Sequence, residues 1–236
     1  MLPRSLPALA LPALALLAAC GGSPPPTAHP RPAPTPCPTG DALDAAAIAA
    51  WRHGDGEVIA TCAPLQVGGA PAWVIAGFLE RPTDDDAGLG AWTAVVRPTG
   101  EVLALDGDDG LPPGAIDHTT GDAWTAADLD GDGDDELIHV EGYSHMGYST
   151  TSLSVLRVTG AALVQVSDLI ELDSDNTAAI TEDDPDADRP HTCTGTWKLE
   201  PTARGQRLVI ARTGDSDCPR DRLVLQLTPA GMTAAP

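Results

Sequence analysis

Short apolar runs separated by clusters of glycine, proline and aspartate fill the chain from Val58 onward. Because such clusters interrupt a helix, the pattern is typical of short β-strands joined by turns. We expect strands at residues 58–62, 72–80, 91–97, 102–106, 122–127, 136–141, 150–159, 162–169, 194–199, 208–213, 223–228 and 232–234.

Residues 41–52 differ from the rest of the chain. They are rich in alanine, begin with an acidic residue, and place Leu43, Ala47 and Trp51 at helical spacing. These features predict a short amphipathic helix that covers the sheet.

Several predicted strand pairs share one design, in which the first strand ends in a turn at Gly100, Gly160 or Gly231 and the second returns. Recurrence of such a unit is typical of propeller blades and of stacked antiparallel sheets. We expect three degenerate units, at roughly 55–115, 120–175 and 190–236. The predicted fold class is mainly β, with antiparallel blade-like meanders in an incomplete or atypical β-propeller and one short N-terminal helix.

The run Asp128-Leu-Asp-Gly-Asp-Gly-Asp-Asp-Glu136 is the most informative acidic segment. Asp128, Asp130 and Asp132 occupy its first, third and fifth positions, and the glycine that follows permits a sharp turn. Ca²⁺ takes about six to eight oxygen ligands, which alternating carboxylates on such a loop can supply. The backbone carbonyl of Asp134 and the carboxylate of Glu136 would add further ligands. We expect Ca²⁺ here, and the alternative is a solvated acidic turn without metal.

This run resembles the calcium loops of FG-GAP and VCBS repeat proteins, in which a D-x-D-x-D-G-x-x-D/E sequence precedes an apolar strand. Residues 128–136 followed by 137–140 match that arrangement, and the resemblance covers residues from about 124 to 169. The resemblance implies a β-blade with a loop-bound calcium ion and implies no particular activity. An EF-hand fits less well, because His139 stands where an EF-hand has its bidentate glutamate.

Three shorter acidic turns begin at Asp106, Asp173 and Asp215. Each lacks the third spaced carboxylate and the glycine after it. They are equally compatible with degenerate copies of the calcium loop and with plain acidic turns, so we assign no metal to them.

The N-terminus has the layout of an export signal, with Arg4 ahead of an apolar stretch from Leu6 to Ala19. Leu17-Ala-Ala-Cys20 resembles the lipobox of bacterial lipoproteins, which implies that residues 1–19 are a signal peptide and that Cys20 becomes lipid-modified. An ordinary secretory signal is the alternative. We therefore expect a lipid-anchored protein of the bacterial envelope. In lipoproteins of enteric bacteria, an aspartate directly after the lipid-modified cysteine marks retention in the inner membrane. This chain has Gly21 at that position, so we expect the outer rather than the inner membrane.

Residues 20–40 combine the lipidated cysteine with a proline-rich tether. Such composition favours extended polyproline geometry, which at about 3.1 Å per residue would reach roughly 60 Å. Residues 41–236 are enough for one core, and we expect them to form a single β-rich FG-GAP/VCBS-like domain.

The formal net charge of −21 argues against nucleic acid and against an anionic lipid surface as partners, because both would be repelled. Divalent cations and basic partners fit better. We expect contact with the membrane through the lipid anchor only, and a partner that is an envelope protein or polymer of unknown identity.

Four cysteines remain besides Cys20, an even number in a chain addressed to an oxidising compartment. Three connectivities are open, and proximity favours Cys37 with Cys62 and Cys193 with Cys218. A zinc site is a poor alternative, because no C-x-x-C pair is present.

Complete catalytic motifs are absent from the sequence. Residues 142–146 approach a G-x-S-x-G nucleophile elbow, but Met146 replaces the second glycine. Neither H-E-x-x-H nor a P-loop occurs. We therefore expect a non-enzymatic calcium-binding module with an interaction or structural role; the alternative is an exported enzyme, such as a hydrolase, whose site the sequence does not reveal.

A glycine-flanked hairpin loop at residues 142–149 offers Tyr143, His145 and Tyr148 as candidate partner-binding side chains. In the alternative interpretation, the tyrosines fold back over the edge of the sheet.

Overall fold

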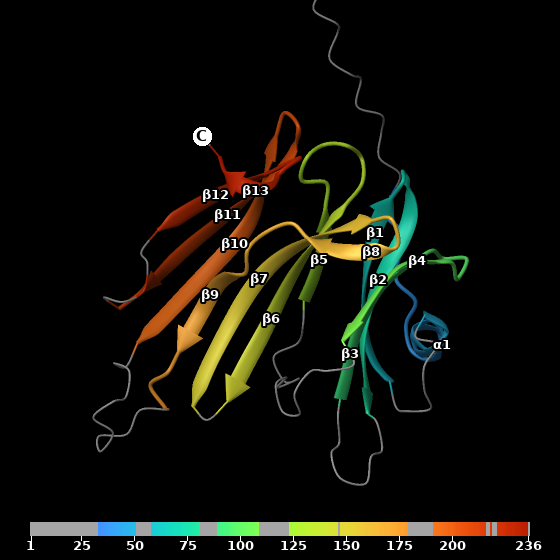
Figure 1. The fold of residues 1–236 in the computed structure, drawn as a ribbon, viewed down its shortest axis with the longest axis horizontal. Coiled ribbons are helices and arrows are strands. Elements are labelled where there is room, and N and C mark those ends of the chain that lie inside the picture. The colour runs from blue at the N-terminus through green and yellow to red at the C-terminus, as the bar shows by residue number, and fades with distance from the viewer. Residues whose placement is uncertain are drawn as a thin grey trace, which may run out of the picture. The chain divides into compact units, whose positions relative to one another are not determined.

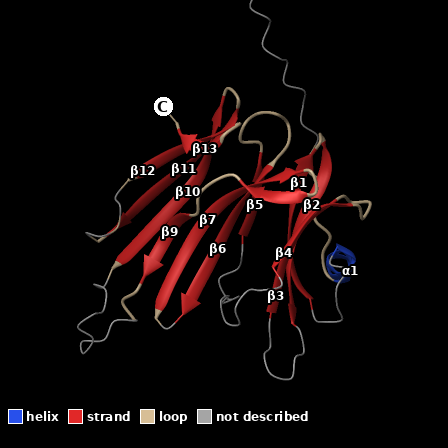
Figure 2. Ribbon diagram, viewed as in Figure 1, coloured by secondary structure: helices blue, strands red, loops and turns tan. Residues whose placement is uncertain are grey.

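Antiparallel β-strands make up most of the described chain, as the sequence predicts (Figures 1 and 2). This computed structural model describes residues 33–50, 58–80, 89–108, 123–145, 147–178, 191–215, 218 and 221–235. They belong to one compact unit, Ala33–Pro236. The elements are α1 (Asp41–Ala50), β1 (Val58–Val67), β2 (Ala70–Glu80), β3 (Leu89–Val96), β4 (Val102–Asp108), β5 (Ala123–Ala127), β6 (Glu136–His145), β7 (Tyr148–Thr159), β8 (Ala162–Gln165), β9 (Ile170–Asp175), β10 (Thr192–Thr202), β11 (Gly205–Gly214), β12 (Arg222–Thr228) and β13 (Gly231–Ala234).

The first sheet is a four-stranded meander in the order β1-β2-β3-β4, as expected for the first predicted unit. Helix α1 packs through Ala47 against Ile75 and Trp92 of this sheet. A side chain at Gly77 would lie 2.7 Å from the ring of Trp92, so the indole fills the space that a larger residue would need.

The second sheet contains all the remaining strands, in the order β13-β12-β11-β10-β9-β7-β6-β5, with β8 paired to β7 (Figure 1). The second and third predicted units therefore do not form separate blades. They are joined by β9, which pairs with both β7 and β10.

Strand β9 corrects the interpretation of its acidic residues as a turn. Leu172 is buried in the hydrophobic core of the second sheet, while Glu171 and Asp175 are exposed. The side chains of this segment therefore alternate between core and solvent, as those of a strand do. Similarly, Asp106 lies within β4 rather than in a turn. Strands pair through backbone hydrogen bonds, so carboxylates that point to solvent do not prevent an acidic segment from forming a strand.

Two core clusters hold the second sheet. One lies within it and includes Leu153, Leu208 and Ile210. The other brings the two sheets together, with Leu65 and Val74 of the first sheet packing in one cluster with Leu137 and Leu163 of the second. Trp92 is buried in the core of the first sheet, and Trp73, Trp124 and Trp197 are partly buried against the hydrophobic clusters. Trp51 lies outside the described residues.

Both disulfides predicted from proximity are confirmed, Cys37 with Cys62 and Cys193 with Cys218. The first one fixes residues 33–40, the last part of the predicted tether, to β1. The Trp73 Nε1–H also donates to the Thr35 carbonyl at 3.1 Å. This short segment therefore belongs to the folded unit. Residues 1–32, which include the predicted signal peptide and Cys20, lie outside the described residues.

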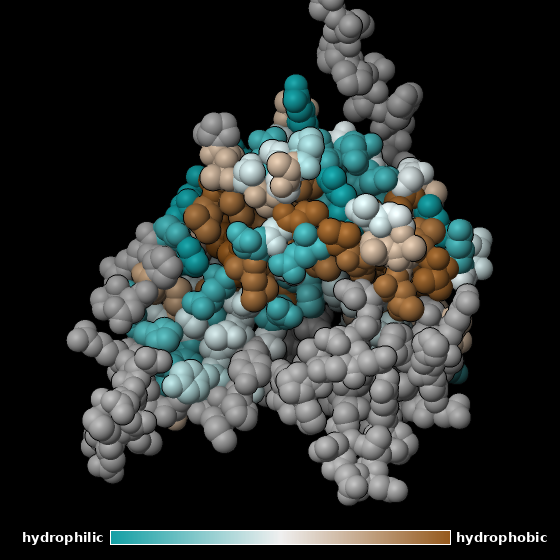
Figure 3. Space-filling model, in the orientation of Figure 1, coloured by the Kyte–Doolittle hydropathy of each residue, from teal (hydrophilic) through white to brown (hydrophobic). Residues whose placement is uncertain are grey.

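Within the described part of the chain, no helix is both long and apolar enough to cross a membrane. On the face drawn in Figure 3, hydrophobic and hydrophilic residues lie side by side. The large apolar side chains most exposed among the described residues include Leu169, at 56%, and Val164, at 42%.

Candidate metal centre

The acidic run forms the turn between β5 and β6. Leu129 is fully buried in the main core and anchors the first half of the turn. Gly131 and Gly133 have φ angles of +79° and +97°, a region that other residues rarely adopt, so the glycines are needed for the chain to reverse here.

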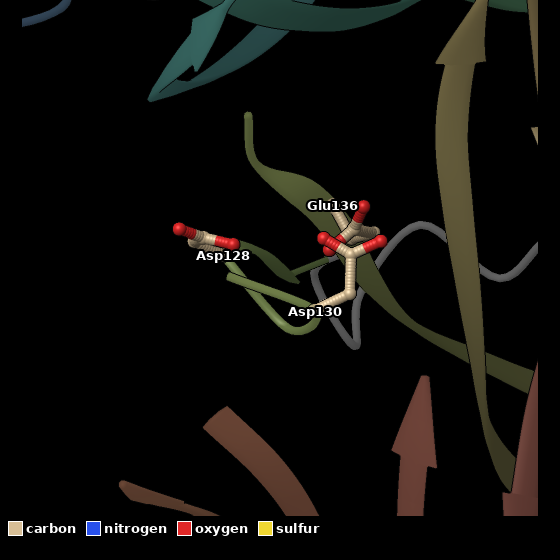
Figure 4. A group of neighbouring side chains, drawn as sticks. All are labelled: Asp128, Asp130 and Glu136. Atoms are coloured by element: carbon tan, nitrogen blue, oxygen red, sulfur yellow. The ribbon is translucent and has the colours of Figure 1, made fainter. Parts of the chain in front are cut away.

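Three carboxylates converge at this turn, those of Asp128, Asp130 and Glu136 (Figure 4). One oxygen from each lies within 4.8 Å of the others. Glu136 is the first residue of β6 and is buried, whereas the two aspartates on the turn are half-buried. These three carboxylates together could hold a metal ion.

Asp132 and Asp134, the other predicted ligand residues, do not join this group. Asp132 is exposed and its Oδ1 accepts a hydrogen bond from the Asp134 N–H at 2.9 Å. The Asp134 side chain points to another part of the chain, where its Oδ1 accepts from the Gly69 N–H at 3.0 Å. The predicted role of Asp134 used its backbone carbonyl, so this side-chain contact does not conflict with it.

Backbone hydrogen bonds fold the turn around the carboxylates. Asp128 accepts from the Gly131 N–H at 2.7 Å and from the Gly133 N–H at 3.2 Å. Glu136 Oε2 accepts from the Leu129 N–H at 2.9 Å. These bonds orient the side chains but leave lone pairs on the carboxylate oxygens.

A cationic side chain, Arg157 of β7, also reaches the cluster. Its Nε donates to Glu136 Oε1 at 2.9 Å, and its Nη2 lies 2.9 Å from the same oxygen. Nη2 also donates to Asp130 Oδ2. Sequence reasoning missed Arg157, whose one local signal was a single basic residue between Leu156 and Val158 in the predicted strand 150–159.

Electrostatics at the turn are dominated by burial and crowding of negative charge. Burial raises the pKa of Glu136 to about 7, against the opposing effect of the Leu129 N–H and of Arg157. Partial desolvation raises the pKa of Asp132, and the Asp130 and Asp134 carboxylates add to that shift. Six acidic residues stand in the nine-residue run, and one guanidinium cannot neutralise them.

The turn is also fastened to the first sheet. Gln66, at the end of β1, donates its N–H to Asp135 Oδ2 at 2.8 Å and accepts the Asp135 N–H at 2.8 Å through its carbonyl. Asp135 is 3% exposed. Arg97 holds the β1–β2 turn in place by donating to the carbonyls of Ala70 and Pro71 at 2.8 and 3.1 Å.

On another side, the β10–β11 turn packs directly on the acidic turn. A Cβ added to Gly205 would lie 2.7 Å from both the Asp128 carbonyl oxygen and the Gly131 nitrogen. A Cβ on Gly131 would lie 2.9 Å from the backbone of Arg204. Because two backbones meet here without side chains between them, glycine is required at both positions.

His139, which stands at the position of the EF-hand glutamate, does not belong to the group of three carboxylates. Its ring stacks on Trp124, with centroids 4.1 Å apart and an interplanar angle of 11°. In an EF-hand, the residue at this position binds the ion, whereas His139 packs on an aromatic ring of the neighbouring strand.

The candidate partner-binding residues lie on strands rather than on a loop. Tyr143 and His145 belong to β6, and Tyr148 begins β7, where it pairs with His145. Tyr148 is 41% exposed. The side chains of Tyr143 and His145 lie outside the described part of the structure.

A polar groove of about 220 Å³ lies beside this hairpin, where β7, β9 and β10 meet. Ser149, Asp175 and Thr192 are paired across the three strands and share one side of the sheet. Hydrogen bonds from Thr177 lower the pKa of Asp175, which keeps this carboxylate charged. The groove can therefore offer hydroxyl groups and carboxylates as hydrogen-bonding partners.

The donor set at the acidic turn consists of carboxylate oxygens, the ligand type that hard divalent cations prefer. Asp128, Asp130 and Glu136 fit such a cation. Comparison of the chain with known protein families, with curated proteins and with solved structures finds no match.

Proposed function

We propose that the protein is a non-enzymatic, calcium-binding lipoprotein of the bacterial envelope that acts as an interaction or structural module. The observation that carries the calcium assignment is the convergence of Asp128, Asp130 and Glu136 on a turn of the D-x-D-x-D-G type. Its likeness in sequence to FG-GAP and VCBS calcium loops supports the same assignment.

Calcium suits this turn better than magnesium does. Mg²⁺ requires a small octahedral shell and gives up its water reluctantly, whereas Ca²⁺ accepts an irregular shell of protein oxygens. Asp132 and the Asp134 carbonyl would complete the shell together with the three converging carboxylates. When bound, the ion would supply positive charge to a run of carboxylates that has too little of it.

A structural role for the ion follows from the contacts of the turn. Asp134 binds Gly69 of the β1–β2 turn, and the Gly131 backbone meets Gly205 at the β10–β11 turn. An ion that fixes the acidic turn would therefore stabilise the junction of three distant chain segments. Extracellular modules bind calcium with a Kd near 10⁻⁴ M, so at about 1 mM Ca²⁺ linkage gives on the order of 1.4 kcal/mol.

Calorimetric titration and thermal melting test this proposal. We expect a heat of Ca²⁺ binding and a melting temperature a few degrees higher in about 1 mM Ca²⁺ than in chelator. Asp130→Asn should abolish the difference, because asparagine keeps the shape and loses the charge. Asp175→Asn, an equal change at an exposed residue of β9, should keep it. Identical melting of the wild type in calcium and chelator, without heat of binding, would refute calcium binding.

The envelope assignment rests on the lipobox-like run that ends at Cys20 and on the proline-rich segment after it. We propose that the lipid on Cys20 anchors the unit to the outer membrane and that the segment separates the two. The mature protein should partition into detergent, and Cys20→Ser should release it or leave it unprocessed. Recovery of an unmodified mature protein with a different first residue would contradict the lipoprotein assignment.

A binding partner would be sought in envelope extracts. We propose that the partner is an envelope protein or polymer, and that calcium is needed for its capture because the ion fixes the junction. Pull-downs with wild type and Asp130→Asn, each in calcium and in chelator, separate calcium-dependent capture from non-specific adsorption. Capture that is equal under all four conditions would argue against a calcium-dependent interaction.

A further inference from the structure

We propose that Arg157 is a built-in counter-cation of the acidic turn, which holds the turn together without metal and competes with Ca²⁺ for the same oxygens. This inference rests on the proposed calcium function and adds how the site is regulated. Its consequence is that calcium binding is an exchange of one cation for another, rather than the filling of a bare acidic site.

The contacts of Arg157 place its charge at the centre of the cluster. Its guanidinium bridges Asp130 Oδ2 and Glu136 Oε1, which belong to two of the three converging carboxylates. The Glu136 side chain is 1% exposed and that of Asp130 is 20% exposed. The bridge therefore links a buried carboxylate to a half-buried one from a residue six positions earlier.

Arginine is suited to this role because its guanidinium remains charged and presents several donors in a fixed plane. A buried carboxylate without a countercharge is strongly destabilising. Glu136 otherwise accepts only the Leu129 N–H among the described contacts. Arg157 thus supplies the charge that allows Asp130 and Glu136 to lie close together when no metal is bound.

Competition follows from the identity of the oxygens. A cation held by Asp130 and Glu136 would need the carboxylates that Arg157 now occupies, and two positive charges at one site repel each other. The Arg157 side chain is 28% exposed and long, so its guanidinium can withdraw toward water. Among the described residues, Asp128 forms no hydrogen bond or ion pair with Arg157, so this carboxylate can receive an entering ion before Arg157 is displaced.

Calorimetric Kd values for Ca²⁺ and melting temperatures in chelator would test the inference in wild type, Arg157→Gln and Arg157→Lys. Glutamine removes the charge but keeps a polar side chain. Arg157→Gln should bind Ca²⁺ on the order of tenfold more tightly, because hydrogen bonds to charged groups are strong and no longer oppose the ion. In chelator it should melt several degrees below wild type, since the carboxylates lose their countercharge.

Arg157→Lys keeps the charge but loses the planar bridge, so its affinity for Ca²⁺ should lie between those of wild type and Arg157→Gln. This variant decides the matter if Arg157→Gln does not fold in chelator. Arg212→Gln is the matched control, because Arg212 forms a comparable two-bond ion pair with Asp221 further along β11 from the acidic turn. The control should bind Ca²⁺ as wild type does.

The outcomes separate this inference from the proposed function. Wild-type binding with equal or weaker affinity in Arg157→Gln and Arg157→Lys would overturn the inference and leave the calcium function intact. Binding in Arg157→Gln but not in wild type would support competition by Arg157 while overturning the proposed function. Absence of binding in wild type and both variants would overturn both.

Discussion

Replacing Gly205 by alanine tests whether the β10–β11 turn truly rests on the acidic turn. Gly205 has a φ of +89°, and an added Cβ would lie 2.7 Å from the Asp128 carbonyl oxygen and from the Gly131 nitrogen. These neighbours are backbone atoms, which cannot rotate away as the end of a side chain can. The substitution should therefore force the two turns apart.

The expected loss of stability has two parts. A left-handed conformation costs about 1–2 kcal/mol in a residue with a Cβ. Overpacking against fixed atoms adds about 1–3 kcal/mol. Reduced freedom of the unfolded chain offsets about 0.4–1 kcal/mol. The net loss of about 1–5 kcal/mol corresponds to a fall in melting temperature of roughly 2–20 °C for a domain of this size.

Gly160→Ala is the matched control. Gly160 also has a positive φ, +63°, but a Cβ there would have no neighbour within 4 Å. It should therefore show only the conformational part of the loss, about 1 kcal/mol. Both variants would be melted in chelator, so that changes in metal binding do not contribute. Equal losses for Gly205→Ala and Gly160→Ala would show that the close approach of the turns makes no contribution.

Three further predictions concern other contacts of the fold. Asp135→Ala should lower the stability by about 1–3 kcal/mol, because it leaves the buried Gln66 N–H without its acceptor, whereas Asp135→Asn can retain this bond; equal denaturation midpoints for the two variants would contradict that reason. Hydrogen bonds from Lys198 and Arg207 lower the pKa of Glu200 from 4.5 to about 2, so its stabilising contribution is present above pH 4.5 and is lost as the pH falls to about 2. Denaturation of wild type and Glu200→Gln at pH 5 and pH 2 should therefore show a smaller difference at the lower pH, and a constant difference would exclude this linkage. The disulfide between Cys193 and Cys218 closes a separation of 25 residues and should contribute about 3 kcal/mol, so the double alanine variant should melt several degrees lower, and an unchanged melting temperature would rule out that contribution.

Local patterns in the sequence were sufficient for much of the fold. Alternating apolar runs and turn glycines such as Gly100 and Gly160 predicted the β class and most of the strands, because periodicity and turn conformation depend on neighbouring residues. Proximity along the chain was also enough to predict both disulfides. The acidic turn could be identified for the same reason, since all its candidate ligands lie within nine residues.

Strand neighbours and the surroundings of the acidic turn were decided by the tertiary structure alone. The alternation within residues 170–175 shows which side chains can face the core, but only packing of Leu172 in that core makes the segment a strand that joins two predicted units. Periodicity specifies a face and not a neighbouring strand.

The same limit applies to the site. Arg157 reaches Glu136 from 21 positions away, Gln66 binds Asp135 across 69 positions, and Gly205 meets Gly131 through backbone contact. No local pattern encodes these pairs, because they depend on how two sheets and their turns fit together in space. The sequence determined which residues form the acidic turn. The tertiary structure decided that Arg157, the end of the β1–β2 hairpin and the β10–β11 turn hold it in place.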